Sequence, residues 1–243
     1  MKQISSFIIL FSFLLCRSVS SAQESMNPAK TTQQVQIGIS ASPQNFTLAP
    51  AYCVYFGLGK SKRFRIGAGL RYNFNLNTDQ EYRTSPAHLT SGQEGPQVLF
   101  SEDKPENIDT LKVGRASFNS INLGIYLAYL IHPKWEIGFN IDAIGVTFGP
   151  GASGEFIDRS GVPGLDEVKA KPFNFNALLV SDNDLGSLNS ELYVQHKFSA
   201  HWAARTGATF IFSELKTDIK PRLENDRFRH KSLQVMGGIS YIF

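Results

Sequence analysis

The sequence of 243 residues predicts an all-β fold: an antiparallel up-and-down β-barrel of about eight strands that crosses a membrane. Three observations support this prediction. After residue 22, apolar and polar residues alternate with a period of two, which is typical of strands with two different faces. The connections between these segments alternate between short and long. No later apolar run approaches the roughly 18 residues of a spanning helix, so only a closed barrel could place this chain in a membrane.

The segment 1–22 has the organisation of a secretory signal peptide. Lys2 precedes the apolar run Phe7–Leu15, and small residues stand at Ser20 and Ala22. This run is about half of the roughly 20 residues that a membrane anchor needs. We therefore expect cleavage after residue 22 and a mature region at residues 23–243.

The mature region is nearly neutral and keeps a single cysteine. Loss of Lys2 and Arg17 leaves 22 basic residues against 21 acidic ones, so the net charge falls to about +1. This balance does not point to nucleic acid as a partner. Because only Cys53 remains, no internal disulfide can form in the exported protein.

Eight segments of the mature region alternate as strands do, and Arg63–Leu76 is the clearest of them. The others are Val35–Ala41, Ala51–Leu58, Ser120–Ile131, Trp135–Asp142, Ser187–Phe198, Trp202–Ser213 and Leu233–Phe243. The stretch Pro172–Val180 could extend a strand or add to the number, which leaves ten strands as the alternative.

The connections divide into two classes that an outer-membrane barrel would place on opposite sides of the membrane. Short turns stand near Lys60, at His132–Lys134 and at Ser199–His201. The long polar segments, at about 77–111 and 149–186, are rich in Gly, Pro, Asp, Asn and Ser. With both termini periplasmic, the long segments are expected to be extracellular loops.

The apolar face is expected to point outward, because the lumen of an eight-stranded barrel is only just wide enough to be filled by side chains. Glycines share the opposite, inward parity with a nearly balanced set of charges, which we expect to form a paired network. The large residues of the outward face include Phe64, Leu70, Tyr72, Phe74, Leu123, Ile125, Leu127, Tyr129, Trp135, Phe139, Trp202, Phe210, Phe212 and Tyr241. The inward charges are Arg65, Arg71, Lys197, Arg205, Glu136, Asp142 and Glu191.

The signal peptide, the alternating segments and the ending VMGGISYIF resemble the small outer-membrane β-barrel proteins of Gram-negative bacteria. Within that family, the size and loop plan are similar to the eight-stranded OmpX-like and PorT-like barrels. A C-terminal Phe after alternating apolar residues is the feature that the barrel-assembly machinery reads in this family. The resemblance therefore implies the cell outer membrane as the location, with its lipids and that machinery as partners.

No motif predicts catalytic, cofactor-binding or metal-binding residues. Lipid A deacylases resemble this chain in size and use His and Ser two residues apart on one outer face, whereas His196 and Ser199 are three apart and on opposite faces. The five histidines have no metal-ligand spacing, and Gly57–Lys62 lacks the spacing of a phosphate loop. The histidines are His88, His132, His196, His201 and His230.

These observations favour a non-enzymatic outer-membrane barrel with a filled lumen, acting in envelope structure, adhesion or partner docking. The first alternative is a porin-like barrel that passes small solutes and needs more strands or an emptier lumen. A lipid-modifying enzyme and a soluble secreted binder are further alternatives. The sequence identifies no extracellular ligand or protein partner.

Overall fold

The computed structural model describes residues 30–93, 102–160, 163–179 and 183–243, so the predicted signal peptide lies outside the described residues. Eleven strands and two short helical turns are found in these ranges. The strands are β1 (Thr31–Ser42), β2 (Asn45–Leu58), β3 (Phe64–Thr84), β4 (Thr110–His132), β5 (Trp135–Phe148), β6 (Ala152–Ile157), β7 (Pro163–Pro172), β8 (Phe175–Ala177), β9 (Leu188–Lys197), β10 (Trp202–Thr217) and β11 (Arg227–Ile242). The helical turns are α2 (Ala87–Thr90) and η2 (Pro105–Asn107). No helix in the described ranges is long and apolar enough to cross a membrane.

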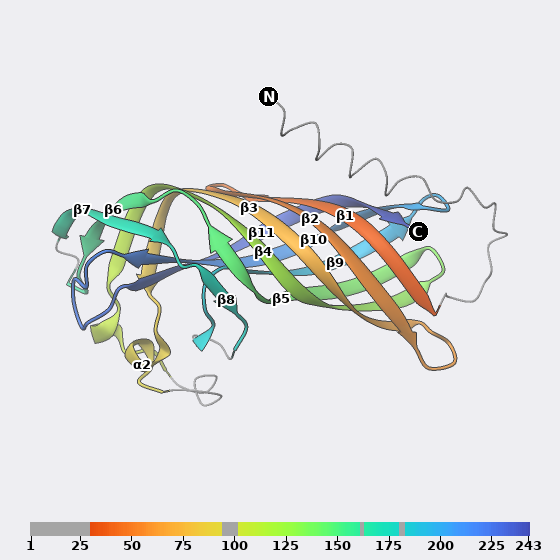
Figure 1. Ribbon diagram of the computed structural model, residues 1–243, viewed down its shortest axis with the longest axis horizontal. Helices are drawn as coiled ribbons and strands as arrows, with labels where there is room; N and C mark the ends of the chain where they lie inside the picture. Colours follow the sequence, from red (N-terminus) through yellow and green to blue (C-terminus); the bar gives the residue numbers. More distant parts are fainter. Residues whose placement is uncertain (1–29, 94–101, 161–162, 180–182) are drawn as a thin grey trace, which may run out of the picture.

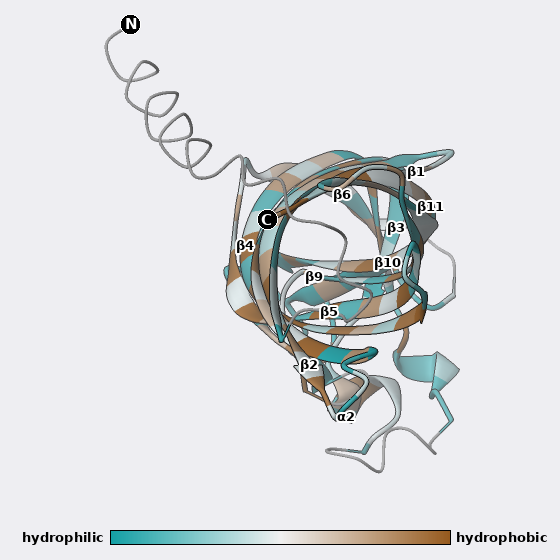
Figure 2. Ribbon diagram, turned by 90° about the vertical axis from the view of Figure 1, so that its right-hand side faces the viewer, coloured by the Kyte–Doolittle hydropathy of each residue, from teal (hydrophilic) through white to brown (hydrophobic). Residues whose placement is uncertain are grey.

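Eight of the described strands form a closed antiparallel ring in the order β1-β2-β3-β4-β5-β9-β10-β11 (Figures 1 and 2). The ring closes where Val35 of β1 pairs with Tyr241 of β11. The predicted barrel of eight strands is confirmed. Pro172–Val180 does not add a strand to this ring, because β8 pairs with β5 above the point where β9 begins.

The three short turns lie at one end of the ring together with the end of β11. The Ile242 amide donates to the carbonyl of His201 at 2.7 Å, and the Gly57 amide donates to Lys30 at 2.8 Å. Exposed aromatic residues gather at this end, where Trp202 and Tyr241 make an edge-on contact with ring centroids 5.1 Å apart. Aromatic residues at such an end are typical of the girdle that outer-membrane barrels place at the membrane interface.

The outward face of the ring is apolar and exposed, while the interior is polar. Leu123 is 55% exposed and Leu233 is 69% exposed, whereas Arg71 is only 1% exposed. Hydrophobic and hydrophilic residues alternate along the strands in Figure 2. The exposed set forms an apolar band around the ring, with members on all eight strands. The predicted face assignment is therefore confirmed, with one exception.

The exception is Phe212, which was expected on the outward face and is only 7% exposed. The segment 183–187, which precedes β9, packs over the outer end of β10. There, the Gly186 amide donates to the Glu214 carboxylate at 2.7 Å, and Arg229 donates to the carbonyl of Asp184. Phe212 is buried because this segment, which we call the excursion, covers its outward face.

Above the apolar band, four strands of the ring continue and close a second, smaller ring. In the described residues, β11 pairs with β3 at Phe228–Thr84, and the hairpin β6–β7 joins β4 to β10, giving the order β3-β4-β6-β7-β10-β11. Figure 1 shows β6 and β7 at the end of the molecule opposite the C-terminus. The segments 77–111 and 149–186 are expected from the sequence to be loops, but both contribute strands to this second ring. The sequence pattern does not reveal them because the inward parity of β3 and β4 changes above the lower ring.

This change of register occurs at Asp79. Inward positions on β3 are odd-numbered up to Asn77 and even-numbered from Gln80 onward. Asp79 has a positive φ of 49° and lies opposite Gly114 of β4, where the inward parity also changes. In the smaller ring the interior is apolar, and its buried cluster contains Tyr82, Leu111, Val113, Ala116, Phe156, Val168, Ala170, Leu215 and Phe228.

The face assignment predicts a depth-dependent cost for charge on β4. Ile125 is 45% exposed midway along the apolar band, and Ile131 is 56% exposed beside the turn at His132. We expect Ile125→Arg to destabilise the folded barrel by about 2–4 kcal/mol and Ile131→Arg by about 0–1 kcal/mol, because the cost of a basic side chain falls from the bilayer midplane to the interface. The measurement is the fraction with folded mobility on unboiled gels across a urea series in lipid vesicles. Equal costs at the two positions would contradict the assignment.

Candidate functional site

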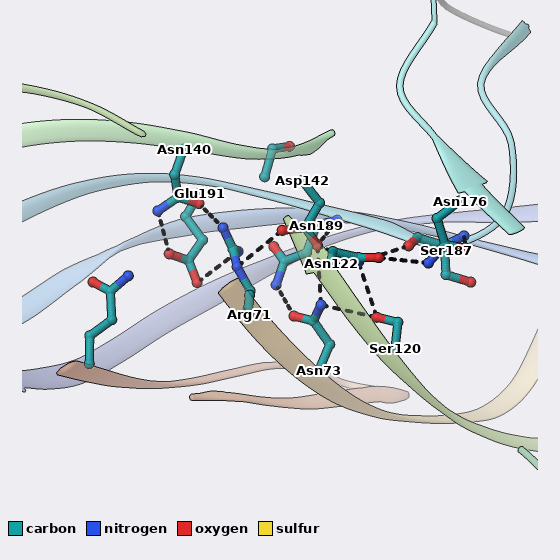
Figure 3. Close-up of polar contacts among 12 residues, drawn as sticks. Arg71, Asn73, Ser120, Asn122, Asn140, Asp142, Asn176, Ser187, Asn189 and Glu191 are labelled. Atoms are coloured by element: carbon teal, nitrogen blue, oxygen red, sulfur yellow. Dashed lines mark hydrogen bonds and ion pairs between the residues drawn. The ribbon is translucent and has the colours of Figure 1, made fainter. Parts of the chain in front are cut away.

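The candidate site is the charged network that fills the lumen of the eight-stranded ring (Figure 3). Its centre is Arg71 of β3, which is surrounded by groups from the opposite wall. Arg71 Nε lies 3.2 Å from Asp142 Oδ1, and Arg71 Nη1 lies 3.4 Å from Glu191 Oε1. The same guanidinium donates to the side chain of Asn140. Strands β3, β5 and β9 are thus joined across the barrel interior.

Glu191 connects this centre to a second arginine. Arg205 Nη2 of β10 lies 3.1 Å from Glu191 Oε2, and Asn140 donates to the same oxygen at 2.8 Å. Arg205 also donates to Gln36 of β1. Its guanidinium carbon lies 3.8 Å from the centre of the Tyr193 ring, which gives a cation–π contact. Glu191 therefore binds two arginines that come from different walls.

Asp142 is held by amides as well as by Arg71. Its Oδ2 accepts hydrogen bonds from Asn122 at 2.7 Å and from Asn73 at 3.1 Å. The backbone amide of Asn189 donates to the same oxygen at 3.1 Å. A buried carboxylate is tolerated when its charge is paired and hydrogen-bonded, and here Arg71 pairs the charge while three donors occupy Oδ2.

A further pair lies closer to the short turns. Arg65 and Glu136 form an ion pair in which both side chains are buried. Beside them, the hydroxyl groups of Tyr55 and Tyr193 lie 3.1 Å apart. A methyl group built on Gly69 would lie 2.7 Å from the Tyr126 ring, so this part of the lumen has no room for a larger side chain.

Six of the seven predicted inward charges form ion pairs with one another. Three arginines face three carboxylates, so the buried set is neutral. Lys197 differs: it is half-buried at the end of β9, and within the described residues it has no ion pair. Sequence reasoning missed the amide and tyrosine partners. The inward parity of Asn73, Asn122 and Asn140 was the signal that could have found them.

The outer end of the network meets the smaller ring. Asn77 donates to the Tyr82 hydroxyl at 3.0 Å and to Ser213 at 3.3 Å. Tyr82 belongs to the apolar cluster of the smaller ring. The sequence of layers along the axis is therefore an ionic layer, an amide and hydroxyl layer, and an apolar core.

The residues considered for chemistry lie apart from this network. His196 stacks on Trp135 with ring centroids 4.3 Å apart, while Ser199 Oγ accepts the Trp202 amide at 3.0 Å in the short turn. Within the described residues, no contact joins His196 to Ser199. No group of three or more His, Cys, Asp or Glu residues that could hold a metal ion is found there either.

Comparison with known proteins gives structural similarity only. No family model and no curated protein matches the sequence. A solved structure described as a de novo designed transmembrane β-barrel is similar, with 11% identity, a TM-score of 0.37, and coverage of 90% of this chain and 100% of that one. Neisserial surface protein A shows 8% identity, a TM-score of 0.35, and coverage of 87% and 94%. The Yersinia pestis outer membrane protein Ail in a nanodisc shows 8% identity, a TM-score of 0.36, and coverage of 87% of this chain and 99% of that one. Similarities at this level assign no function.

The chain's own structure defines its class. In the described residues the eight strands pair into a closed ring, the apolar band faces outward, and the polar groups are inside. A segment in hydrocarbon must satisfy its backbone groups internally, and a closed barrel does so. Antiparallel barrels with this distribution of residues belong to bacterial outer membranes. The chain is a transmembrane β-barrel of the outer-membrane type.

The network predicts that Arg71 is needed for stability. Arg71→Met removes the partner of Asp142 and one partner of Glu191, so we expect a loss of about 3–5 kcal/mol in the free energy of unfolding. Arg63→Met is the control, because Arg63 is exposed in the turn between β2 and β3, and it should have almost no effect on the free energy of unfolding. Urea titration of both variants in lipid vesicles provides the measurement.

The same network predicts a rescue. Adding Asp142→Asn and Glu191→Gln to Arg71→Met removes the unpaired charges and should recover part of the lost stability. A triple variant less stable than Arg71→Met, or an Arg71→Met variant as stable as Arg63→Met, would contradict the account of the network.

Proposed function

We propose that this protein is a non-enzymatic, non-conducting outer-membrane barrel that holds a rigid platform above the membrane for adhesion or for docking of a partner. The platform is the six-stranded ring formed by β3, β4, β6, β7, β10 and β11. The observation that carries this proposal is the filling of the lumen, ionic within the band and apolar above it.

The ionic layer supports the absence of conduction. An eight-stranded barrel has an interior only just wide enough for side chains, and this one contains the large side chains of Arg71, Tyr55, Tyr126 and Tyr193. Moving a solute along the axis would require separating Arg71 from two carboxylates in a region of low dielectric. The apolar core above would then oppose a hydrated ion a second time.

The outer ring supports the platform role. Four of its six strands are continuous with those of the membrane ring, and its exposed side chains include charged residues such as Glu81, Arg83 and Lys112. A surface of this kind is suited to contact with water and with macromolecules, in contrast to the apolar band below. We further propose that the last strand, β11, together with the terminal Phe243 is the segment read by the barrel-assembly machinery.

The alternative functions make different demands on the same residues. A porin-like barrel needs a continuous polar path past Arg71 and past the apolar cluster. A lipid-modifying enzyme needs a nucleophile and a base in contact on the outer wall. We place both below the platform role because the lumen is packed and because His196 and Ser199 are engaged with other groups.

The proposal predicts that the purified protein will not conduct. After insertion into planar bilayers, we expect no steady ohmic conductance, with a porin inserted under the same conditions as the positive control. Stable, large conductance steps in the parent protein would replace the platform proposal by the porin-like alternative.

The orientation of the platform is tested by proteolysis. Trypsin added to intact cells should cut at an exposed site such as Arg159, which lies in the connection between β6 and β7 of the outer ring. Lys60, in a short turn at the opposite end, should be cut only after the outer membrane is permeabilised. Cleavage at Lys60 in intact cells would reverse the orientation.

A further inference from the structure

The end of the eight-stranded ring that carries the short turns is rich in lysine. Lys30 precedes β1, Lys60 and Lys62 lie between β2 and β3, Lys134 lies between β4 and β5, and Lys197 ends β9. The side chains of Lys30, Lys60 and Lys134 are exposed, and the other two are half-buried. We call these five residues the lysine rim. Neither the lumenal network nor the platform role accounts for it.

The lysine rim has little negative charge beside it. In the described ranges, the acidic side chain at this end is Glu136, which is buried and forms an ion pair with Arg65. The terminal carboxylate belongs to Phe243, whose amide donates to the carbonyl of Gln33 at 3.0 Å. None of the five lysines forms an ion pair with a described residue. The rim therefore keeps an excess of positive charge.

Acidic side chains are concentrated at the other end of the molecule. Apart from Glu136 and the lumenal carboxylates of Asp142 and Glu191, every acidic residue that the structure describes lies in the outer ring, in its connections or in the excursion. Charge is thus segregated along the barrel axis. A field of one sign surrounds the short turns, and such a field attracts anions.

The fold holds cations of the rim side by side. The Lys197 amide donates to the carbonyl of Lys134 at 2.8 Å, so these two residues are neighbours on adjacent strands. The Gly57 amide donates to the carbonyl of Lys30 at 2.8 Å, which brings Lys30 next to the turn that contains Lys60. Like charges on neighbouring strands are destabilising. An anion from outside the protein would relieve this repulsion.

Aromatic residues place the lysine rim at the level of the lipid head groups. Trp135 is exposed and follows Lys134 directly in the sequence. Trp202 and Tyr241 make their edge-on contact at the same end of the ring. Trp and Tyr side chains prefer the membrane interface, and lysine side chains extend from there to the head groups. The continuity of apolar band, aromatic residues and lysines favours a membrane lipid over a soluble partner.

We propose that the lysine rim binds the phosphate groups of anionic phospholipids around the short-turn end of the barrel. An ammonium group pairs with a phosphate oxygen through a charge-assisted hydrogen bond. Each basic side chain at a membrane surface strengthens the attraction to anionic lipid about fivefold. In the orientation proposed above, these lipids belong to the inner leaflet of the outer membrane. The binding itself requires neither that orientation nor a closed lumen, so its test is independent of both.

Lipid selectivity at the barrel surface is the measurement. The parent protein is reconstituted in phosphatidylcholine vesicles with a trace of phosphatidylglycerol, or of phosphatidylcholine, that carries a spin label on one acyl chain. Electron paramagnetic resonance gives the fraction of each labelled lipid that the barrel immobilises. We expect selection of phosphatidylglycerol by about twofold, less than for a single contact because most lipids around the barrel do not touch the rim. In 1 M NaCl the selectivity should fall towards one, because the Debye length shortens to about 3 Å.

Two triple variants of the rim test whether its charge is responsible. Lys30→Gln, Lys60→Gln and Lys134→Gln together remove the exposed charges of the rim and should lower the selectivity towards one. Lys30→Arg, Lys60→Arg and Lys134→Arg together preserve the charge and should keep the selectivity of the parent.

The matched control makes the same change of charge at the other end of the molecule. It combines Lys112→Gln, Lys169→Gln and Lys171→Gln, at three exposed positions of the outer ring. This control should select phosphatidylglycerol as strongly as the parent does. Folded mobility on unboiled gels confirms for each variant that the barrel has formed.

The outcomes decide whether the lysine rim binds lipid. Absence of selectivity in the parent at low salt, selectivity that persists in 1 M NaCl, or equal loss in the rim and control glutamine variants would overturn the proposal. Fluorescent polyglutamate serves as a soluble acidic probe for the parent in phosphatidylcholine vesicles. Binding of polyglutamate without selection of phosphatidylglycerol would assign the rim to a soluble acidic partner instead of a lipid.

Discussion

Closure of the backbone hydrogen-bond ring, where β1 meets β11, is the constraint on which the rest of this structure depends. Within hydrocarbon, a strand edge would leave amides and carbonyls without partners, at a cost of several kcal/mol for each group. Closing the ring with eight strands removes that cost and also fixes the diameter. The diameter then limits what the interior can hold, so the choice of strand number determines the kind of side chains found inside.

In an interior of that width, charge is compatible with folding only if it is balanced locally. Glu191 illustrates the solution: it lies between Arg71 and Arg205, and Asn140 occupies a remaining acceptor position. Each arginine also contacts an aromatic ring, Tyr126 or Tyr193. The result is a core that joins opposite walls through directed contacts, whereas an apolar core would rely on packing alone. Such contacts link β3, β5, β9 and β10 directly across the lumen.

The sequence was sufficient for those features that follow from the period-two pattern in one register. It predicted the outward position of Leu123 and Ile125 and the inward position of Arg71 and Glu191. It did not predict the outer ring, because the change of parity at Asp79 ends the pattern on which strand recognition relies. It also predicted that Phe212 is exposed to lipid, which is wrong. The burial of Phe212 depends on the excursion, and the period-two pattern does not show that this segment lies beside β10.

The two rings share β3, β4, β10 and β11, and this has a consequence for how the molecule behaves as a mechanical object. A domain attached by a linker can rotate, lag or detach while its anchor stays in place. Here the same continuous strands form the walls of both barrels, so neither can shear or loosen without straining the hydrogen-bond ladders of the other. A load applied at the outer end would therefore pass along four covalent strands into the membrane ring, so that the two rings would bear it together.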